Sequence, residues 1–208
     1  MGLFEYLINA SELFIQQKKE WTEIIVNWET SNRYAILDRN KHMLGSIAER
    51  KGGVLHTLKR LFLGSHRGFK IDIFDNDGSL KLHLTREFFF FFSDLKITDS
   101  QGRFFGSVRR RFGVIHKKYD LYDQNDQIFA TIKSPIWRLW SFPVEFLTGK
   151  VQQAKIAKKW GGGLREIFTD ADTYMVDFGV GNWTLEERAV LFAAAISIDF
   201  DFFENNNN

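Results

Sequence analysis

Apolar and polar residues alternate with a period of two in paired segments between residues 34 and 132. In each pair the first segment ends near an aspartate, a short polar turn follows, and a second alternating segment returns. The pairs are 34–38 with 43–47, 69–75 with 80–84, 95–99 with 104–108, and 119–123 with 128–132. Asp75-Asn-Asp-Gly78 and Asp99-Ser-Gln-Gly102 supply the side-chain acceptors and the glycine that tight turns favour. The pattern therefore predicts a series of antiparallel hairpins.

A fifth, less regular hairpin is expected around Gly149, between segments 144–147 and 151–157. The sequence shows no alternation of strand and helix, so it gives no indication of a parallel sheet. Hairpins that each have one apolar face bury it by closing into a barrel or by stacking as a sandwich. The predicted fold class is therefore mainly β.

The segment 185–203 breaks this alternation and predicts a helix. Thr184 is a candidate N-cap, and Glu187 completes a capping box three residues later. The segment is apolar on every side from 189 to 196, so its helix lies inside a protein or across a bilayer. Ten apolar residues give roughly 15 Å of helix against about 30 Å of hydrocarbon, and Asp199 and Asp201 follow directly.

We therefore expect this helix to be buried in the core of the domain. The residues predicted to form its buried centre are Val190, Leu191, Phe192 and Ile196. The alternation in 198–202 leaves open whether the last turn is helical or extended. Residues 205–208, all asparagine, are expected to be a disordered tail.

Composition indicates one domain, over residues 1–204. The 208 residues include 22 phenylalanines, 2 prolines and no cysteine, so disulfides, thiolate metal sites and S-acyl anchors are excluded. The net charge of +2 hides a basic body before residue 165 and an acidic tail after it. The first residues lack the basic and apolar regions of a signal peptide, and we expect a cytoplasmic protein.

Two basic segments are candidate binding sites for lipid headgroups or other anions. Lys59 and Arg60 belong to an amphipathic stretch, 54–62, which either lies on an anionic membrane surface or caps an end of the barrel. The densest cluster of positive charge consists of Arg109, Arg110, Arg111, Lys117 and Lys118 on neighbouring predicted strands. It either binds phosphate, a lipid headgroup or nucleic acid, or is an ordinary solvated face.

Aromatic residues provide two further candidates for membrane contact. Trp137 and Trp140 follow Pro135 and either mark a membrane interface or plug an end of the barrel. The five consecutive phenylalanines 88–92 are too short to span a bilayer, and a buried strand is the expected interpretation. We find no nucleophile–base pairing, no His-x-x-x-His pair and no phosphate loop, so the sequence predicts a protein that is not an enzyme.

Four segments of the chain resemble the phospholipid scramblase family. They are 154–172, with Trp160 before three glycines and Thr-Asp-Ala-Asp at its end; the carboxy-terminal helix with 198–204; and the opening segments 13–18 and 28–34. The resemblance implies a tubby-like fold, which is a closed antiparallel β-barrel of about 12 strands around a hydrophobic C-terminal helix. It also implies phospholipid movement between bilayer leaflets or peripheral phospholipid binding.

The chain departs from this family in two respects. The cysteine cluster and the proline-rich leader of well-known scramblases are absent from the sequence. The family's proposed calcium loop maps to Asp170 and Asp172, but the later positions of an EF-hand-type loop lack oxygen ligands. These aspartates therefore form either a weak calcium site or an Asp-rich turn.

The sequence thus predicts a protein peripheral to the membrane, with an anionic phospholipid surface as its partner. A soluble tubby-like interaction module that binds a protein partner, without translocation activity, is the alternative. Nucleic-acid binding through Arg109–Arg111 is the third choice.

Overall fold

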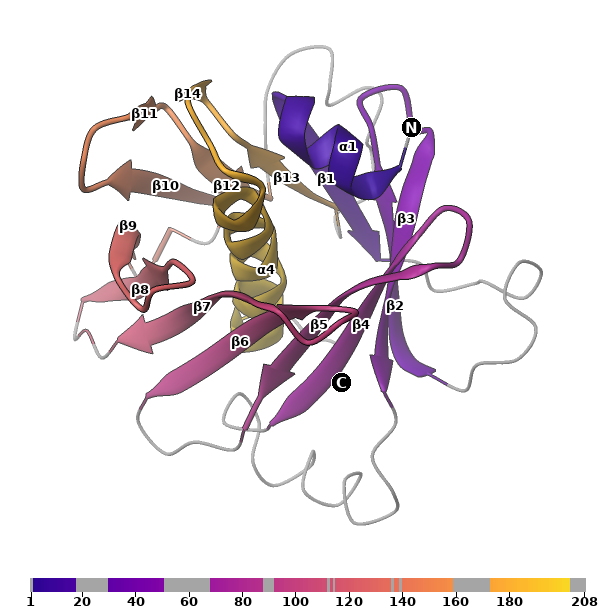
Figure 1. Ribbon diagram of the computed structural model, residues 1–208. Helices are drawn as coiled ribbons and strands as arrows, with labels where there is room; N and C mark the ends of the chain where they lie inside the picture. Colours follow the sequence, from indigo (N-terminus) through magenta and orange to yellow (C-terminus); the bar gives the residue numbers. More distant parts are fainter. Residues whose placement is uncertain are drawn as a thin grey trace.

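The computed structural model describes residues 2–17, 30–50, 68–87, 92–111, 113, 115–135, 137–138, 140–158 and 173–202. Twelve strands within these ranges form a closed barrel, and every neighbouring pair is antiparallel. Along the wall, the order is β1-β13-β12-β10-β9-β8-β7-β6-β5-β4-β3-β2 (Figure 1). The predicted fold class is confirmed.

The strands of the barrel have the following bounds: β1 Glu12–Gln17, β2 Thr30–Leu37, β3 Met43–Arg50, β4 Phe69–Asp75, β5 Leu80–Arg86, β6 Ser93–Asp99, β7 Phe104–Arg111, β8 His116–Tyr122, β9 Ile128–Pro135, β10 Ser141–Phe146, β12 Lys155–Ala157 and β13 Thr173–Asp177. A separate two-stranded sheet pairs β11, Val151–Gln152, with β14, Val180–Gly181. The two helices within the described ranges are α1, Leu3–Asn9, and α4, Leu185–Phe202.

The turn aspartates stabilise the predicted hairpins as expected. Oδ1 of Asp38, Asp99 and Asp123 each accepts backbone N–H bonds from the residues two and four positions later, at 2.8–2.9 Å. Asp75 differs from these three, because its Oδ1 accepts a hydrogen bond from the backbone N–H of Leu3 at 3.1 Å. This bond attaches the start of α1, which the sequence analysis did not predict, to the end of β4.

The helix α4 occupies the interior of the barrel (Figure 1). Its capping box forms as predicted, because Glu187 N–H donates to Thr184 Oγ1 at 3.1 Å and Thr184 N–H to Glu187 Oε2 at 3.0 Å. All residues from Glu187 to Asp201 are buried. The last turn is helical, which settles the alternative left open for 198–202. Within the described residues, no helix combines the length and apolar character needed to cross a bilayer.

Contact between α4 and the wall is tightest at β7, where a glycine is required. Gly106 has φ +147°, and a Cβ there would lie 2.2 Å from the Tyr122 carbonyl oxygen and 2.8 Å from Val190 Cγ2. A larger residue would push β8 and the helix away from β7. Gly106 therefore fixes how closely the helix packs against the barrel wall.

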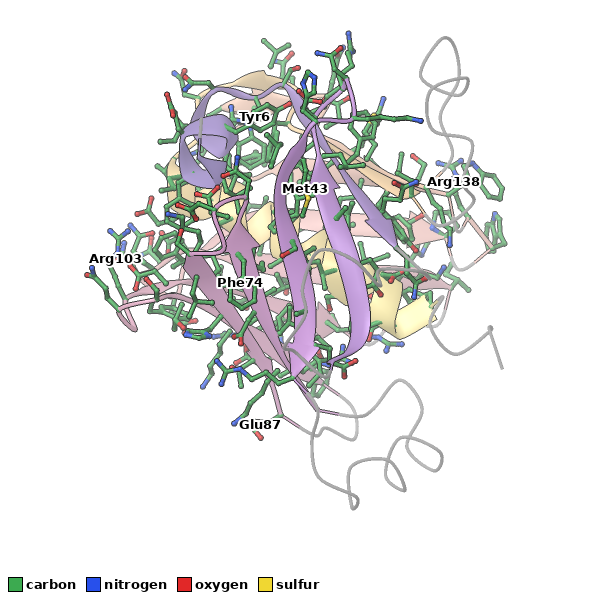
Figure 2. The ribbon with its side chains drawn as sticks, turned by 90° about the vertical axis from the view of Figure 1, so that its right-hand side faces the viewer. Tyr6, Met43, Phe74, Glu87, Arg103 and Arg138 are labelled. Atoms are coloured by element: carbon green, nitrogen blue, oxygen red, sulfur yellow. The ribbon has the colours of Figure 1, made fainter. Side chains whose placement is uncertain are left out.

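The two ends of the barrel differ in their connections. We call one end the turn-side rim; it carries the hairpin turns 38–42, 76–79, 100–103 and 123–127, together with α1 and the start of α4. We call the other end the loop-side rim; it joins β5 to β6, β7 to β8 and β9 to β10, and α4 ends there. Figure 2 shows Arg103 of the turn-side rim and Arg138 of the loop-side rim at opposite sides of the molecule.

Part of the outer wall is itself covered. A small apolar cluster on the outer faces of β1, β2, β12 and β13 contains buried Phe14, Ala35, Leu37, Ala157 and Met175, with Met43 packed against it. Because these side chains are already buried, this part of the wall does not offer an exposed apolar face to a protein partner.

Candidate functional site

The predicted cluster of positive charge divides between the two faces of the barrel wall. β7 and β8 are neighbours, with Arg110 opposite Tyr119 and Arg111 opposite Lys118. Because side chains alternate between the faces of a strand, Arg109, Arg111 and Lys118 lie outside and Arg110 and Lys117 lie inside. The five cations therefore do not share one face of the wall, and whether they bind an anion stays a prediction.

The outer arginines of this cluster are paired with carboxylates. Arg109 contacts Asp126 and lies 3.7 Å from Asp94, and Arg111 Nε lies 2.7 Å from Asp120 Oδ2. The hydrogen bond to Asp120 raises the pKa of Arg111 above its ordinary value. These pairs interrupt the unbroken basic surface that a nucleic-acid backbone needs.

The inner cations lie beside the last residue of α4. Lys117 Nζ is 4.1 Å from the centre of the Phe202 ring and 5.5 Å from that of Phe142, and the Arg110 guanidinium carbon is 5.4 Å from the Phe202 ring centre. Arg110 Nη1 is 3.7 Å from Asp201, beyond hydrogen-bonding distance. Within the described part of the chain, neither Lys117 Nζ nor Arg110 Nη1 has a hydrogen-bond acceptor.

Burial, and to a smaller extent the charge of Arg110, lowers the pKa of Lys117 from 10.5 to about 8. The unfolded chain then binds more protons than the folded chain between these two values, so the free energy of unfolding rises with pH in that window. We predict that Lys117→Met, compared with the wild type, removes a rise on the order of 2–3 kcal/mol between pH 7.5 and 10. Urea unfolding at both pH values measures it. Lys118→Met, whose side chain is exposed, should keep the rise, and an equal rise in both variants would contradict the assignment.

Deeper inside, the two aspartates of α4 accept hydrogen bonds from the wall. Asp201 accepts from Arg86 Nη1 at 2.7 Å and from Tyr119 Oη at 2.8 Å. Asp199 accepts from Tyr34 Oη at 2.7 Å. Burial, followed by the charge of Asp201, raises the pKa of Tyr119 well above 10, so the phenol stays a hydrogen-bond donor. This network was not predicted from the sequence, although two aspartates in an apolar helix indicate buried partners.

Exposed apolar side chains gather on the loop-side rim. Phe92 is 61% exposed, Ile115 55%, Trp137 66% and Trp140 47%. They belong to three successive connections, β5–β6, β7–β8 and β9–β10. The tryptophans therefore do not plug the barrel, and their contact with a membrane stays a prediction. Phe92 lies before β6 and is exposed, so the expected buried strand is wrong at that position; 88–91 lie outside the described residues.

Exposed apolar residues also occur at the turn-side rim, among them Leu147 and Val180, so exposure alone does not distinguish the ends. The balance of charge differs between the two ends. The hairpin turns of the turn-side rim carry the carboxylates Asp38, Asp77, Asp99, Asp123 and Asp126 against the cations Arg39, Lys41 and Arg103. On the loop-side half, Lys118, Lys133 and Arg138 are exposed, and Glu87 is an exposed carboxylate after β5.

Several predicted site residues lie outside the described residues. These are Lys59 and Arg60 of the amphipathic stretch and the calcium candidates Asp170 and Asp172. Among the side chains that the structure describes, no group of three or more His, Asp or Glu is arranged to hold a metal ion. The calcium expectation remains a prediction.

Comparison with known proteins finds similarity over nearly the whole chain. A family model described as Scramblase matches residues 2–205. Altered inheritance rate of mitochondria protein 25 of Saccharomyces cerevisiae is 29% identical over 241 residues, which cover 97% of this chain and 73% of that protein. No solved structure matches the chain.

Two further relatives carry the scramblase name. A phospholipid scramblase family protein of Schizosaccharomyces pombe is 28% identical, over 95% of this chain and 60% of that protein. Phospholipid scramblase 1 of Mus musculus is also 28% identical, over 98% of this chain and 64% of that protein. The chain thus spans less than two thirds of the length of these two relatives.

Proposed function

The chain belongs to the scramblase family, and from this we propose that it binds phospholipid membranes by docking its loop-side rim on an anionic surface. The observation that carries the proposal is the exposure of Phe92, Ile115, Trp137 and Trp140 on three successive loops of one rim. Tryptophan prefers the membrane–water interface because its ring is apolar and its N–H can stay hydrated there.

Charge sets the orientation of this docking. Each Lys or Arg close to an anionic leaflet contributes about 1 kcal/mol of attraction, which falls off within a Debye length. Lys118, Lys133 and Arg138 lie near the exposed tryptophans, whereas the aspartates of the turn-side rim are repelled. The protein would therefore meet the membrane with the C-terminal end of α4 toward the headgroups.

The test is flotation of the protein with vesicles of anionic or neutral phospholipid. We expect binding to anionic vesicles that weakens with salt, and the double variant Trp137→Ser/Trp140→Ser to bind at least about tenfold more weakly, a loss of about 1.4 kcal/mol. Since both side chains are exposed, the thermal stability of this variant should be unchanged.

Leu147→Ser is the matched control, because Leu147 is 62% exposed at the opposite rim. It should float like the wild type. Equal flotation of the tryptophan variant and the wild type, or wild-type binding that ignores lipid charge and salt, would contradict the docking proposal and favour a soluble interaction module with a protein partner.

Movement of phospholipid between leaflets is the activity that we propose to follow from docking, supported by the names of the relatives. The interior of the barrel is filled by α4, so we place the contact with the acyl chains of the bilayer at the rim and not in the lumen. A scrambling assay with a fluorescent lipid, run with and without calcium, measures this activity. A calcium effect that Asp170→Asn/Asp172→Asn removes would support the expected calcium role.

A further inference from the structure

We propose that Arg110 and Lys117 form an anion site inside the loop-side end of the barrel, and that its ligand is a phosphate group. The site is distinct from the exposed rim: its cations come from the inner faces of β7 and β8, and the Phe202 ring of α4 lies beside both. Assigning the phosphate to a lipid headgroup rests on the proposed function, whereas the anion site itself does not.

Two neighbouring cations lack a hydrogen-bond acceptor among the residues that the structure describes, and one of them, Lys117, is buried. Lys117 is only 8% exposed, and no described residue offers its Nζ, or Nη1 of Arg110, a hydrogen-bond acceptor. A buried donor left without an acceptor costs free energy, and the cost is larger for a charged group. The two like charges also repel, since Arg110 contributes to the lowered pKa of Lys117.

This part of the wall also carries hydrogen-bond donors that suit an anion. Ser93 lies directly opposite Arg110 on β6 and is buried, and its Oγ likewise has no partner among the described residues. An ammonium, a guanidinium N–H and a hydroxyl on three adjacent strands suit an anion with several acceptor oxygens. Phosphate provides them together with a negative charge, and charge-assisted bonds to Arg and Lys are the strong ones.

Among the described residues, the carboxylate that lies beside Arg110 already accepts hydrogen bonds from other groups. Asp201 accepts hydrogen bonds from Arg86 and Tyr119 and stays 3.7 Å from Arg110. The Arg110 side chain is 28% exposed, so the site opens to solvent on its side of the rim. An anion can therefore reach the pair from the end of the barrel that we propose faces the membrane.

Thermal unfolding at pH 7 in inorganic phosphate, against chloride of equal ionic strength, tests the site. At a phosphate concentration tenfold above its dissociation constant, the wild type should gain about 3–6 °C in Tm. Lys117→Met keeps an apolar stem beside Phe142 and Phe202 but should lose the gain, and Arg110→Gln should reduce it.

Lys118→Met is the matched control, because it removes the next lysine along β8, whose side chain is exposed. It should keep the full gain. Equal gains in Lys117→Met and Lys118→Met, or no gain in the wild type, would overturn the proposal. Because Lys117→Met removes a charge that burial disfavours, we expect it to unfold in chloride at a higher Tm than the wild type. That result would show that the variant folds and that loss of the phosphate effect is not loss of structure.

Flotation with vesicles containing phosphatidic acid distinguishes a lipid headgroup from free phosphate. If the headgroup is the ligand, Lys117→Met binds these vesicles several-fold more weakly than Lys118→Met does. If free phosphate is the ligand, both variants float equally and only the Tm gain is lost. The Trp137→Ser/Trp140→Ser variant should keep the Tm gain, so failure of rim docking and failure of the anion site give different results.

Discussion

Replacement of Phe192 with alanine is expected to lower the free energy of unfolding by about 3–5 kcal/mol. The Phe192 side chain has no exposed surface and lies in the centre of α4, surrounded by the barrel wall. Its removal leaves a cavity that the wall cannot close, because neighbouring strands are tied by hydrogen bonds all around the barrel. Urea unfolding of the full chain, followed by far-UV circular dichroism, measures the change.

Phe92→Ala is the control for this prediction. Phe92 is exposed at the loop-side rim, so its removal should change stability by no more than about 0.5 kcal/mol. If Phe192→Ala lowers the free energy of unfolding as little as Phe92→Ala does, α4 is not a tightly packed core element and the architecture would have to be revised.

Replacement of Asp201 with asparagine is expected to cost about 3–5 kcal/mol. The Arg86 and Asp201 side chains are both fully buried and lie 2.7 Å apart, and Tyr119 donates to the same carboxylate. Asparagine keeps the size of the side chain but removes the negative charge facing Arg86. The free energy of unfolding of the variant, measured at pH 7, tests the size of this effect.

Asp120→Asn supplies the comparison on the outer face of the same wall. Asp120 pairs with Arg111 at 2.7 Å, but both side chains are partly exposed, so water screens the pair and its loss should cost less than about 1 kcal/mol. If the inner and outer substitutions cost the same, the network around Asp201 would not anchor the end of α4.

The hairpins could be predicted because their information is local. An aspartate followed by a polar turn and glycine, as at Asp75 or Asp99, specifies a turn through hydrogen bonds within four residues. The buried helix was also predictable from a local segment. A helix that is apolar on every side and too short to span a bilayer is stable only inside the protein. Closure of the barrel, in contrast, depends on β1 pairing with β13, which is a contact between the two ends of the chain.

The division of the cation cluster could have been read from the alternation in β8. Lys117 shares its place in the alternation with Tyr119 and Leu121, which belong to the core, so all three point to the inner face. Lys118 shares its place with the polar positions of the strand and points outward. The five cations are close together in the sequence, but this alternation places them on two faces of the wall. The rim of Phe92, Ile115 and the tryptophans was harder to foresee, because their exposure depends on which loops meet at one end of the barrel.

The orientation of the barrel at a membrane can be measured directly, since the chain has no cysteine and a single one can be introduced at either rim. Trp137→Cys and Leu147→Cys place an environment-sensitive fluorophore at exposed positions on opposite ends. With anionic vesicles, the label at 137 should shift to shorter wavelength and be quenched by acyl-chain quenchers, while the label at 147 stays unchanged. A response at 147 without one at 137 would contradict the proposed docking surface.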